Sequence, residues 1–528
     1  MSIVLSTLNA RYSHTSLGLR YLLANMNDLQ SQTQIQEFVI GVRAADVVEK
    51  LLSLNPQIIG FGVYIWNVEE LTHIVALLKR VAPEITIMLG GPEVSHETGD
   101  QQIIALADYV VTGWGDKTFA RLCGEILRGP KPLMKVHAGE QPPMDEIAFP
   151  YTHYSTEDIA HRTVYVEASR GCPFKCEFCL SALDKTAWPF SLDTFLAELE
   201  DLHGRGARVF KFVDRTFNLN INNSLRILQF FIDKLDANPD DPVFAHFELV
   251  PDHLPDALKD SIRRFPPGTL QFEIGIQSFN PEVQATISRK QNNMKAMENL
   301  RWLREDTQAH LHVDLIAGLP GEDIDSFARG FDQLVTLRPH EIQLGILKRL
   351  RGAPIIRHTE TYALIFDPAP PYQILATDRI DFVMMQRMVR FARYWDLVAN
   401  SGRFAALMPI VLGDAPFARF MALSDWLYAH TDATHRISPE RLSRLLDTWL
   451  KTLPETLPGY RQNIGEEQTT MDALSGSESG RTQATRRQQR HQAALPSALT
   501  RQASISERVS SPSDESGRVR ARSKIINA

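Results

Sequence analysis

Three of the four cysteines of this 528-residue chain, Cys172, Cys176 and Cys179, share one short segment with the spacing C-x3-C-x2-C. The apolar, β-branched residues 163–168 precede them and predict a strand that ends at the cysteine loop. Thiolates bind soft metal centres, such as iron–sulfur clusters and zinc, in preference to magnesium or calcium. The spacing therefore predicts a metal site on a loop that follows a strand.

The number of cysteines bears on which metal this is. A structural zinc site is closed by four ligands, and the fourth cysteine, Cys123, has no second cysteine near it. Three cysteines that hold a four-iron cluster leave one iron open to a small molecule, and the spacing differs from the ferredoxin patterns, which supply a cysteine to every iron. A zinc site and a group of free buried thiols remain as alternatives.

With Phe178 just before its last cysteine, the loop resembles the cluster-binding loop of the radical S-adenosylmethionine (radical SAM) superfamily. The resemblance implies a 4Fe-4S cluster whose open iron chelates the amino and carboxylate groups of S-adenosyl-L-methionine (SAM). It also implies that one electron splits the sulfonium to give a 5′-deoxyadenosyl radical, and that an electron donor such as flavodoxin or ferredoxin supplies this electron.

The composition is that of an ordinary globular protein, with 44% hydrophobic residues, 23% charged residues and a formal net charge of -7. The charge is spread along the chain, so neither nucleic acid nor a membrane surface is an expected partner. No apolar run approaches the roughly 18 residues of a membrane helix, and the first residues lack the basic region of a secretory signal. Clustered thiols without disulfide spacing are typical of a reducing cytosol, so a cytoplasmic protein is expected.

Residues 1–128 alternate strand and helix patterns. The strand candidates are residues 3–8, 35–40, 58–65, 86–89 and 109–112, and each is followed by a helical pattern. These βα units predict an α/β domain with a doubly wound parallel sheet of the Rossmann or flavodoxin-like class. Such sheets bind ligands beyond the carboxyl ends of their strands.

Glycine loops follow the fourth and fifth of these strands, at Gly90 and Gly91 and at Gly113. Glycine lets the backbone approach a flat or phosphorylated ligand closely, or it merely turns the chain. Taken with the cysteine loop downstream, the domain resembles the cobalamin-binding domain that precedes many radical SAM cores. The resemblance implies cobalamin as a further cofactor, held near these glycines.

The loop after the first strand departs from one cobalamin pattern. Domains that bind cobalt from below often carry D-x-H-x-x-G, whereas residues 12–18 here read YSHTSLG, with no aspartate and the glycine one position late. His14 is the candidate lower ligand, and a helix N-cap or surface role is its alternative. Cys123, on the closing helix of the domain, is expected to be a buried inert thiol.

After a Pro-rich linker, residues 129–160, the strand and helix alternation resumes over residues 161–365. The strand candidates are residues 163–168, 209–213, 243–250, 270–276, 310–317 and 341–347. Six units predict an open (β/α)6 barrel of TIM type, which resembles the usual radical SAM core. Chemistry is expected at the carboxyl ends of barrel strands, where the cysteine loop also lies.

The other strand ends supply the remaining site residues that the resemblance implies. Asp214 takes the position that contacts the SAM amino group, where a carboxylate suits an ammonium, although the flanking residues differ from the family's. Glu248 is placed to hold ribose hydroxyls, and Gln277 closes a fourth-strand pattern close to that of the family. Asp314 and Gly318 mark the fifth strand, near the adenine. Each of these residues has a plain structural role as its alternative.

Beyond the sixth strand, Lys348 and Arg351 are expected on the solvated surface, with contacts to substrate anions as the alternative. Residues 366–458 read as helical, with an apolar stripe over 373–394, and resemble the helical C-terminal extension of one uncharacterised radical SAM subgroup. Residues 459–528 are polar and arginine-rich without apolar periodicity, which predicts a disordered tail.

The combined interpretation is a cobalamin-dependent radical SAM enzyme that acts on a small molecule, with methyl transfer to an unactivated carbon as the commonest outcome in the family. A methylthiotransferase is one alternative, but those proteins usually carry three further cysteines in the N-terminal domain, where this chain has only Cys123. A non-catalytic corrinoid or metal sensor is the other. The sequence does not identify the substrate.

Overall fold

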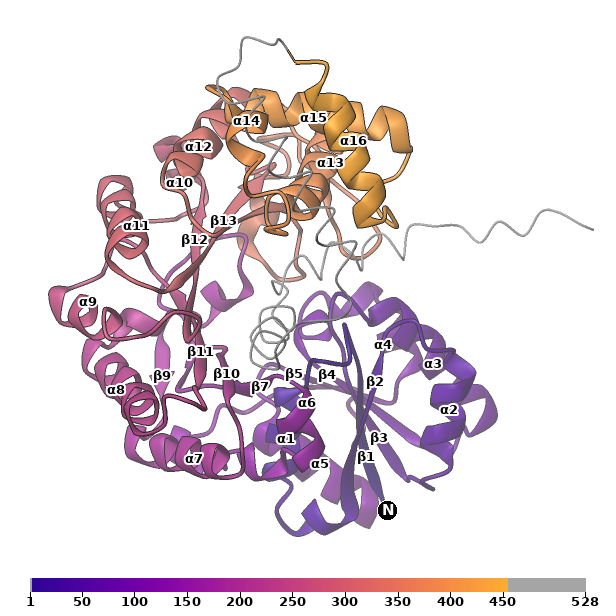
Figure 1. The fold of residues 1–528 in the computed structure, drawn as a ribbon. Helices are drawn as coiled ribbons and strands as arrows, with labels where there is room; N and C mark the ends of the chain where they lie inside the picture. The colour runs from indigo at the N-terminus through magenta and orange to yellow at the C-terminus, as the bar shows by residue number, and fades with distance from the viewer. Residues whose placement is uncertain (1, 454–528) are drawn as a thin grey trace, which may run out of the picture.

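Two parallel sheets and a C-terminal group of helices organise residues 2–453, the part of the chain that the computed structural model describes (Figure 1). The tail expected over residues 459–528 lies outside the described residues. No helix within 2–453 combines the length and the apolar character that crossing a membrane requires.

The first sheet confirms the doubly wound α/β prediction. Its strands are β1 (Ile3–Asn9), β2 (Thr33–Val39), β3 (Ile58–Gly62), β4 (Thr86–Gly90), β5 (Tyr109–Thr112) and β6 (Val136–Ala138). All neighbours pair in parallel, in the order β2-β1-β3-β4-β5-β6. The order reverses between β1 and β3, which is where such sheets open a crevice for ligands.

Helices cover both faces of this sheet. They are α1 (Leu17–Ala24), α2 (Ala44–Leu52), α3 (Val68–Val81), α4 (Gln102–Leu106) and α5 (Asp116–Arg128). The helices α2, α3 and α4 share one hydrophobic core with the sheet, and α1 and α5 share another. In α3, Leu71, Ile74, Val75 and Leu78 are buried at the helical spacing that puts one apolar face against the strands.

Residues 129–160, expected as a linker, also add β6 to the sheet and form the helix α6 (Thr156–His161). A buried charge network clamps α6 to the first domain. Arg20 lies 3.0 Å from Glu37 and 2.8 Å from Asp158, and Arg162 pairs with the same two carboxylates at 2.9 and 2.7 Å. The sequence therefore returns to the first sheet before it enters the second.

This charge network predicts a loss of stability in acid. Burial opposes ionisation, but Arg20 lowers the pKa of Asp158 to about 2 and also holds the pKa of Glu37 below its usual value. Carboxylates with depressed pKa values stabilise the fold fully above their ordinary pKa, near pH 4, and this contribution is lost as the pH falls toward 2. We expect a loss of about 1–2 kcal/mol over this range, after allowance for solvent screening. Thermal unfolding measured against pH checks it.

The matched variants for that measurement are Arg20→Met and Arg43→Met. Arg43 pairs with Asp46, and both side chains are exposed, at 79% and 46%. We expect Arg20→Met to flatten the acid decline and Arg43→Met to keep it. An unchanged pH profile for Arg20→Met would contradict the assignment.

The second sheet confirms the open six-unit barrel. Its strands are β7 (Val164–Val166), β10 (Val209–Phe212), β11 (Phe244–Leu249), β12 (Leu270–Gln277), β13 (His310–Ala317) and β14 (Glu341–Ile346). They pair in parallel in chain order, interrupted only by the small hairpin of β8 (Ser169–Gly171) and β9 (Ala187–Pro189).

Helices cover the outside of this barrel (Figure 1). They are α7 (Leu192–Gly204), α8 (Ile221–Ala237), α9 (Asp256–Ile262), α10 (Pro281–Thr286), α11 (Asn293–Asp306) and α12 (Ile324–Thr336). Apolar residues that alternate along the strands, such as Phe247, Phe272 and Val313, are fully buried in the shared core. The residues between them are polar, so the opposite, inner face of the sheet carries charged and amide side chains.

The C-terminal group consists of α13 (Phe382–Val398), α14 (Met408–Leu412), α15 (Pro416–Thr431) and α16 (Pro439–Leu450). It packs beside α12 and the β14 edge of the barrel (Figure 1). The helix expected over 373–394 begins only at Phe382, because Asp381 caps it by accepting the N–H of Met384 at 2.7 Å. The preceding β16 (Ile374–Ala376) pairs instead with β15 (Ile365–Phe366).

Candidate functional site

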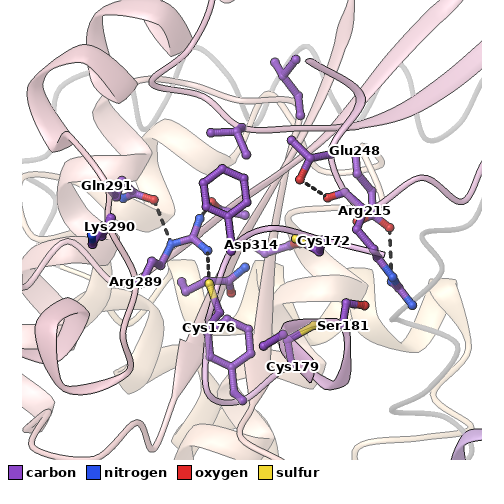
Figure 2. A pocket seen from close by; sticks show the side chains of 18 of the residues that line it. Cys172, Cys176, Cys179, Ser181, Arg215, Glu248, Arg289, Lys290, Gln291 and Asp314 are labelled. Carbon is purple, nitrogen blue, oxygen red and sulfur yellow. Dashed lines mark hydrogen bonds and ion pairs between the residues drawn. The ribbon is translucent and has the colours of Figure 1, made fainter. Parts of the chain in front are cut away.

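The three clustered cysteines line one cavity of about 170 Å³ at the carboxyl end of the barrel (Figure 2). Cys172 is buried, and Cys176 and Cys179 are half-buried. Burial raises the pKa of Cys172 and Cys176, while the nearby Arg289 acts against this at Cys176. These are soft sulfur donors that a metal would hold as thiolates.

The cysteine loop is fastened to the protein by Glu177, which lies between two of the cysteines. Its carboxylate is 3% exposed and accepts hydrogen bonds from Ser288, Arg357 and, at 2.8 Å, His358. Its backbone N–H donates to Ile287, and its carbonyl accepts from Ile355. The loop is therefore positioned by polypeptide contacts at both of its faces. The sequence did not reveal this role, although a charged residue inside a cysteine loop was a signal.

Arg289 reaches the loop from the other side, after α10. Its guanidinium donates to the Cys176 Sγ at 3.5 Å and to the Gln291 side chain at 3.0 Å (Figure 2). It also donates to the carbonyl of Gly275. A cation beside a sulfur donor stabilises negative charge on it. No motif pointed to this residue, because the contact joins segments more than a hundred residues apart.

The donor set fits an iron–sulfur cluster better than a closed zinc site. It consists of three thiols, with no fourth cysteine in the cavity, since Cys123 is buried in α5. Within residues 2–453, no three His, Cys, Asp or Glu side chains already converge on one metal position. Binding of a cluster therefore requires the three cysteine side chains to turn toward it on a loop whose backbone is already anchored.

Two acidic residues from neighbouring strands face the same cavity. Glu248 on β11 and Glu273 on β12 are direct partners in the sheet register. Burial raises the pKa of Glu248, although Arg215 lies 3.6 Å away. Burial also opposes ionisation of Glu273. His246, at 3.3 Å, and Lys211, at 3.6 Å, nevertheless hold the pKa of Glu273 below the usual value. The pair thus combines one carboxylate with one side chain poised to gain a proton.

Gln277 and Asp314 complete this end of the barrel. Gln277 ends β12 with a left-handed φ of 69°, at a register shift against β13, and its side-chain oxygen is buried with no hydrogen-bond partner. Asp314 lies 3.1 Å from His312, and burial raises its pKa. Both line the cysteine cavity, as Glu248 does, so the structure brings these sequence-derived candidates together.

Three other candidates lie elsewhere. Asp214 does not line the cavity: its carboxylate accepts the N–H of Ala168 at 2.9 Å and the hydroxyl of Ser169 at 2.7 Å, and burial raises its pKa to about 7. The next two residues along the chain, Arg215 and Thr216, line the cavity instead. Asp214 therefore stabilises the turn that leads into the cysteine loop, from outside the cavity.

Gly318 and His14 are the other two. A Cβ at Gly318 would lie 2.6 Å from Ile374, so this glycine serves the packing of the segment around β16 rather than a cavity. His14 contacts the hydroxyl of Tyr165 and bridges to Thr163, where the first domain meets β7. It lines none of the three cavities described in this section.

A second cavity, of about 550 Å³, lies at the carboxyl ends of the first sheet and contains the glycine loops. Gly62, Gly90, Gly91 and Gly113 all line it, so backbone rather than side chains forms much of its wall. Gly91 requires glycine, because φ is +108° and a Cβ would lie 2.5 Å from the Val63 carbonyl. A broad pocket with a glycine wall suits a large flat ligand such as a corrin ring.

A third cavity, of about 740 Å³, joins the other two. It shares Cys179, Arg215, Glu248 and other wall residues with the cysteine cavity. It shares Tyr64, Pro92, Leu180 and Asp184 with the glycine-lined cavity. We call it the central cavity, because a molecule within it lies next to both of the others. Tyr64 stacks on Trp66, with ring centroids 4.4 Å apart, to form a flat part of its wall.

Arg170, two residues before Cys172, connects the cysteine loop to the first domain. Its guanidinium lies 2.9 Å from Asp116 at the start of α5 and 2.7 Å from Glu167, and it stacks over Tyr21 at 4.3 Å. Although burial opposes the charge, these carboxylates raise the pKa of Arg170. The side chain of Arg170 thus connects the cysteine loop with the first domain and fixes their relative position.

Two protein-family models match two separate parts of the chain. The model of the B12 binding domain matches residues 3–123, and the model of the radical SAM superfamily matches residues 166–334. An uncharacterized methyltransferase of Pyrococcus horikoshii is 26% identical over 40% of this chain and 52% of its own length. The cobalamin-dependent radical SAM methyltransferase TokK of Streptomyces tokunonensis is 22% identical over 56% of this chain and 47% of its own. The chain thus spans about half the length of these curated relatives.

A solved structure shares the fold. The radical S-adenosylmethionine methyltransferase TsrM from Kitasatospora setae, determined with cobalamin and a 4Fe-4S cluster bound, aligns with a TM-score of 0.59 at 15% identity. The alignment covers 85% of this chain and all of that one. One chain thus combines a region that matches the B12 binding domain with a region that matches the radical SAM superfamily.

Proposed function

We propose that the protein is a cobalamin-dependent radical SAM enzyme that modifies an unactivated carbon of a small molecule, by methyl transfer. The central cavity is the observation that supports this most, because its wall is shared with both the cysteine cavity and the glycine-lined cavity. A substrate there would lie between the two places where the cofactors bind. The two curated relatives are both named methyltransferases, which also supports the proposal.

The cofactors supply the difficult chemistry, since a 4Fe-4S cluster with SAM provides a radical and cobalamin provides a methyl carrier. The protein's residues position them. Cys172, Cys176 and Cys179 would hold the cluster, with Arg289 stabilising charge on one sulfur. Glu248, Gln277 and Asp314 offer carboxylate and amide oxygens to the SAM side of the cavity, which suits hydroxyl and ammonium groups.

The decisive experiment is anaerobic reconstitution of the full chain with iron and sulfide, followed by incubation with SAM and a strong reductant. We expect release of 5′-deoxyadenosine, and a corrinoid absorption spectrum that survives gel filtration after incubation with methylcobalamin. A protein that holds zinc without acid-labile sulfide would contradict the enzyme proposal and favour a sensor. A flavodoxin or ferredoxin is the expected class of electron donor.

The glycine wall makes a separate prediction about corrinoid binding. Gly91→Ala forces a side chain into a backbone conformation that is essentially restricted to glycine, 2.5 Å from a carbonyl. We expect a loss of about 1–3 kcal/mol in stability and clearly weaker retention of hydroxocobalamin on gel filtration.

Gly99→Ala is the matched control for this variant. Gly99 is exposed in the short 3-10 helix Thr98–Asp100, beyond the same strand, and a Cβ there would meet nothing within 4 Å. We expect it to keep both stability and corrinoid. If Gly91→Ala retained corrinoid as well as Gly99→Ala did, the glycine-lined cavity would not be the binding place.

A further inference from the structure

Lys348 lines the central cavity just beyond the end of β14. Its backbone is held there by an antiparallel bridge to Gln373 and by the N–H of Arg349, which donates to the carbonyl of Tyr372 at 2.9 Å. The surface position expected from the sequence is therefore wrong for this residue. Because Lys348 is part of the cavity wall, its ammonium is within reach of a molecule that binds there.

The other cations of the cavity wall already have partners. Arg351 lies 2.9 Å from Glu93, Arg215 lies 3.6 Å from Glu248, and Arg393 donates to a backbone carbonyl at 3.2 Å. Among the residues that the structure describes, Lys348 makes no side-chain hydrogen bond or ion pair. The cavity wall thus contains a cation that no residue within 2–453 compensates.

The carboxylates of the cavity do not neutralise Lys348 either. Asp396 accepts a hydrogen bond from Asn400 at 2.9 Å, Asp184 lies where the central and glycine-lined cavities meet, and Glu273 and Asp314 face the cysteine side. Burial lowers the pKa of Lys348 to about 8, with no nearby anion to raise it again. An incoming anion would restore the charge balance that burial disturbs.

The rest of the wall describes the body of such a ligand. Much of it is apolar, including Leu180, Leu315, Leu344, Ile346 and Val389. The volume of about 740 Å³ exceeds that of a small metabolite such as acetate. Among the described wall residues, one cation without a partner stands among several carboxylates, which favours a ligand with one negative charge over a doubly charged phosphate.

We propose that the substrate is a carboxylic acid with an apolar body, and that its carboxylate pairs with Lys348 while the body extends toward Cys179 and Arg215. This inference rests on the proposed function, since it names the class of molecule on which the enzyme acts. Lys348 is then a residue that selects and positions the substrate.

The test uses the reconstituted full-length protein and a panel of straight-chain carboxylates from hexanoate to dodecanoate, each beside its neutral amide, with isothermal titration calorimetry. We expect at least one carboxylate to bind about tenfold tighter than its amide. Lys348→Met should remove about tenfold of the carboxylate's affinity and leave the amide's unchanged. Equal binding of acid and amide throughout, including no binding of either, or full affinity in Lys348→Met, overturns the proposal.

Two further variants give readouts that a purely structural role would not change. Carboxylate binding to the wild type should weaken as the pH rises above about 8, because Lys348 then loses its proton. Lys348→Arg should retain affinity and move this limit to higher pH, since arginine stays charged. The exposed Lys295→Met should behave as wild type. A pH profile that is the same in all variants contradicts a role for Lys348.

This test and the test of the proposed function fail independently. Calorimetry requires no turnover, so loss of the carboxylate preference would leave 5′-deoxyadenosine release as it was. Absence of 5′-deoxyadenosine release with intact selective binding would instead remove the enzyme proposal and keep the anion site.

Discussion

Replacement of Cys172, Cys176 and Cys179 together by alanine is expected to abolish the brown colour of the reconstituted protein and the release of 5′-deoxyadenosine. These thiols are the sulfur donors of the cysteine cavity, so nothing there replaces them. Substitution of residues that only hydrogen-bond to metal ligands already lowers metal affinity about 10–100-fold. Loss of the ligands themselves should therefore lower the affinity for the cluster at least about 1,000-fold. Iron and acid-labile sulfide assays with a chromatographic assay for 5′-deoxyadenosine measure the effect.

Cys123→Ala is the matched control, because it removes the remaining thiol of the chain. Cys123 is fully buried in α5, with its sulfur 3.8 Å from that of Met88, and burial raises its pKa above the ordinary range. We expect this variant to bind the cluster and cleave SAM as the wild type does. A triple variant that stays brown, or a Cys123→Ala variant that loses colour, would show that the cluster is held elsewhere.

Arg170→Met is expected to give a large loss of stability for a single substitution. It leaves the carboxylates of Asp116 and Glu167 partly or fully buried without their cation, and removal of one partner from a buried ion pair costs about 3–5 kcal/mol. Methionine keeps the bulk of the side chain, so the lost charge is the main change. Calorimetric unfolding should show a lowered transition and, if the domains part, two transitions instead of one.

Arg121→Met tests the same type of change on the surface of α5. Arg121 pairs with Glu125 at 2.8 Å, but the two side chains are 52% and 41% exposed. Exposed pairs contribute about 0–1 kcal/mol, so this variant should unfold nearly as the wild type does. Equal destabilisation by Arg170→Met and Arg121→Met would mean that the buried ion pairs of Arg170 contribute no more to stability than an exposed pair does.

The sequence was sufficient for the strands of both sheets except β6, because the predicted strands are short apolar runs with regular helical patterns between them, whereas β6 is a three-residue strand in a Pro-rich segment. It also located the cysteine loop and the glycine loops, since these residue types are chemically distinctive and follow directly after strands. Glu248, Gln277 and Asp314 were found by the same rule, that barrel chemistry lies at strand ends.

The remaining site residues depend on contacts that a linear sequence does not display. Asp214 also ends a strand, but its carboxylate turns back to the chain at Ala168. Arg289 reaches Cys176, and Arg170 reaches Asp116, across long stretches of sequence. For the same reason the start of α13 was misplaced, because apolar Ile374 fits a helical stripe as well as the strand it forms.

The hydrogen bonds of Glu177 have a consequence for how the protein responds to oxygen. Its carboxylate accepts hydrogen bonds from Ser288, Arg357 and His358, which are contacts between protein side chains and do not run through the cluster. The cysteine loop should therefore keep its conformation in a molecule whose iron–sulfur cluster has been destroyed by oxygen. Repair would then need only fresh iron, sulfide and electrons, not renewed folding of the chain.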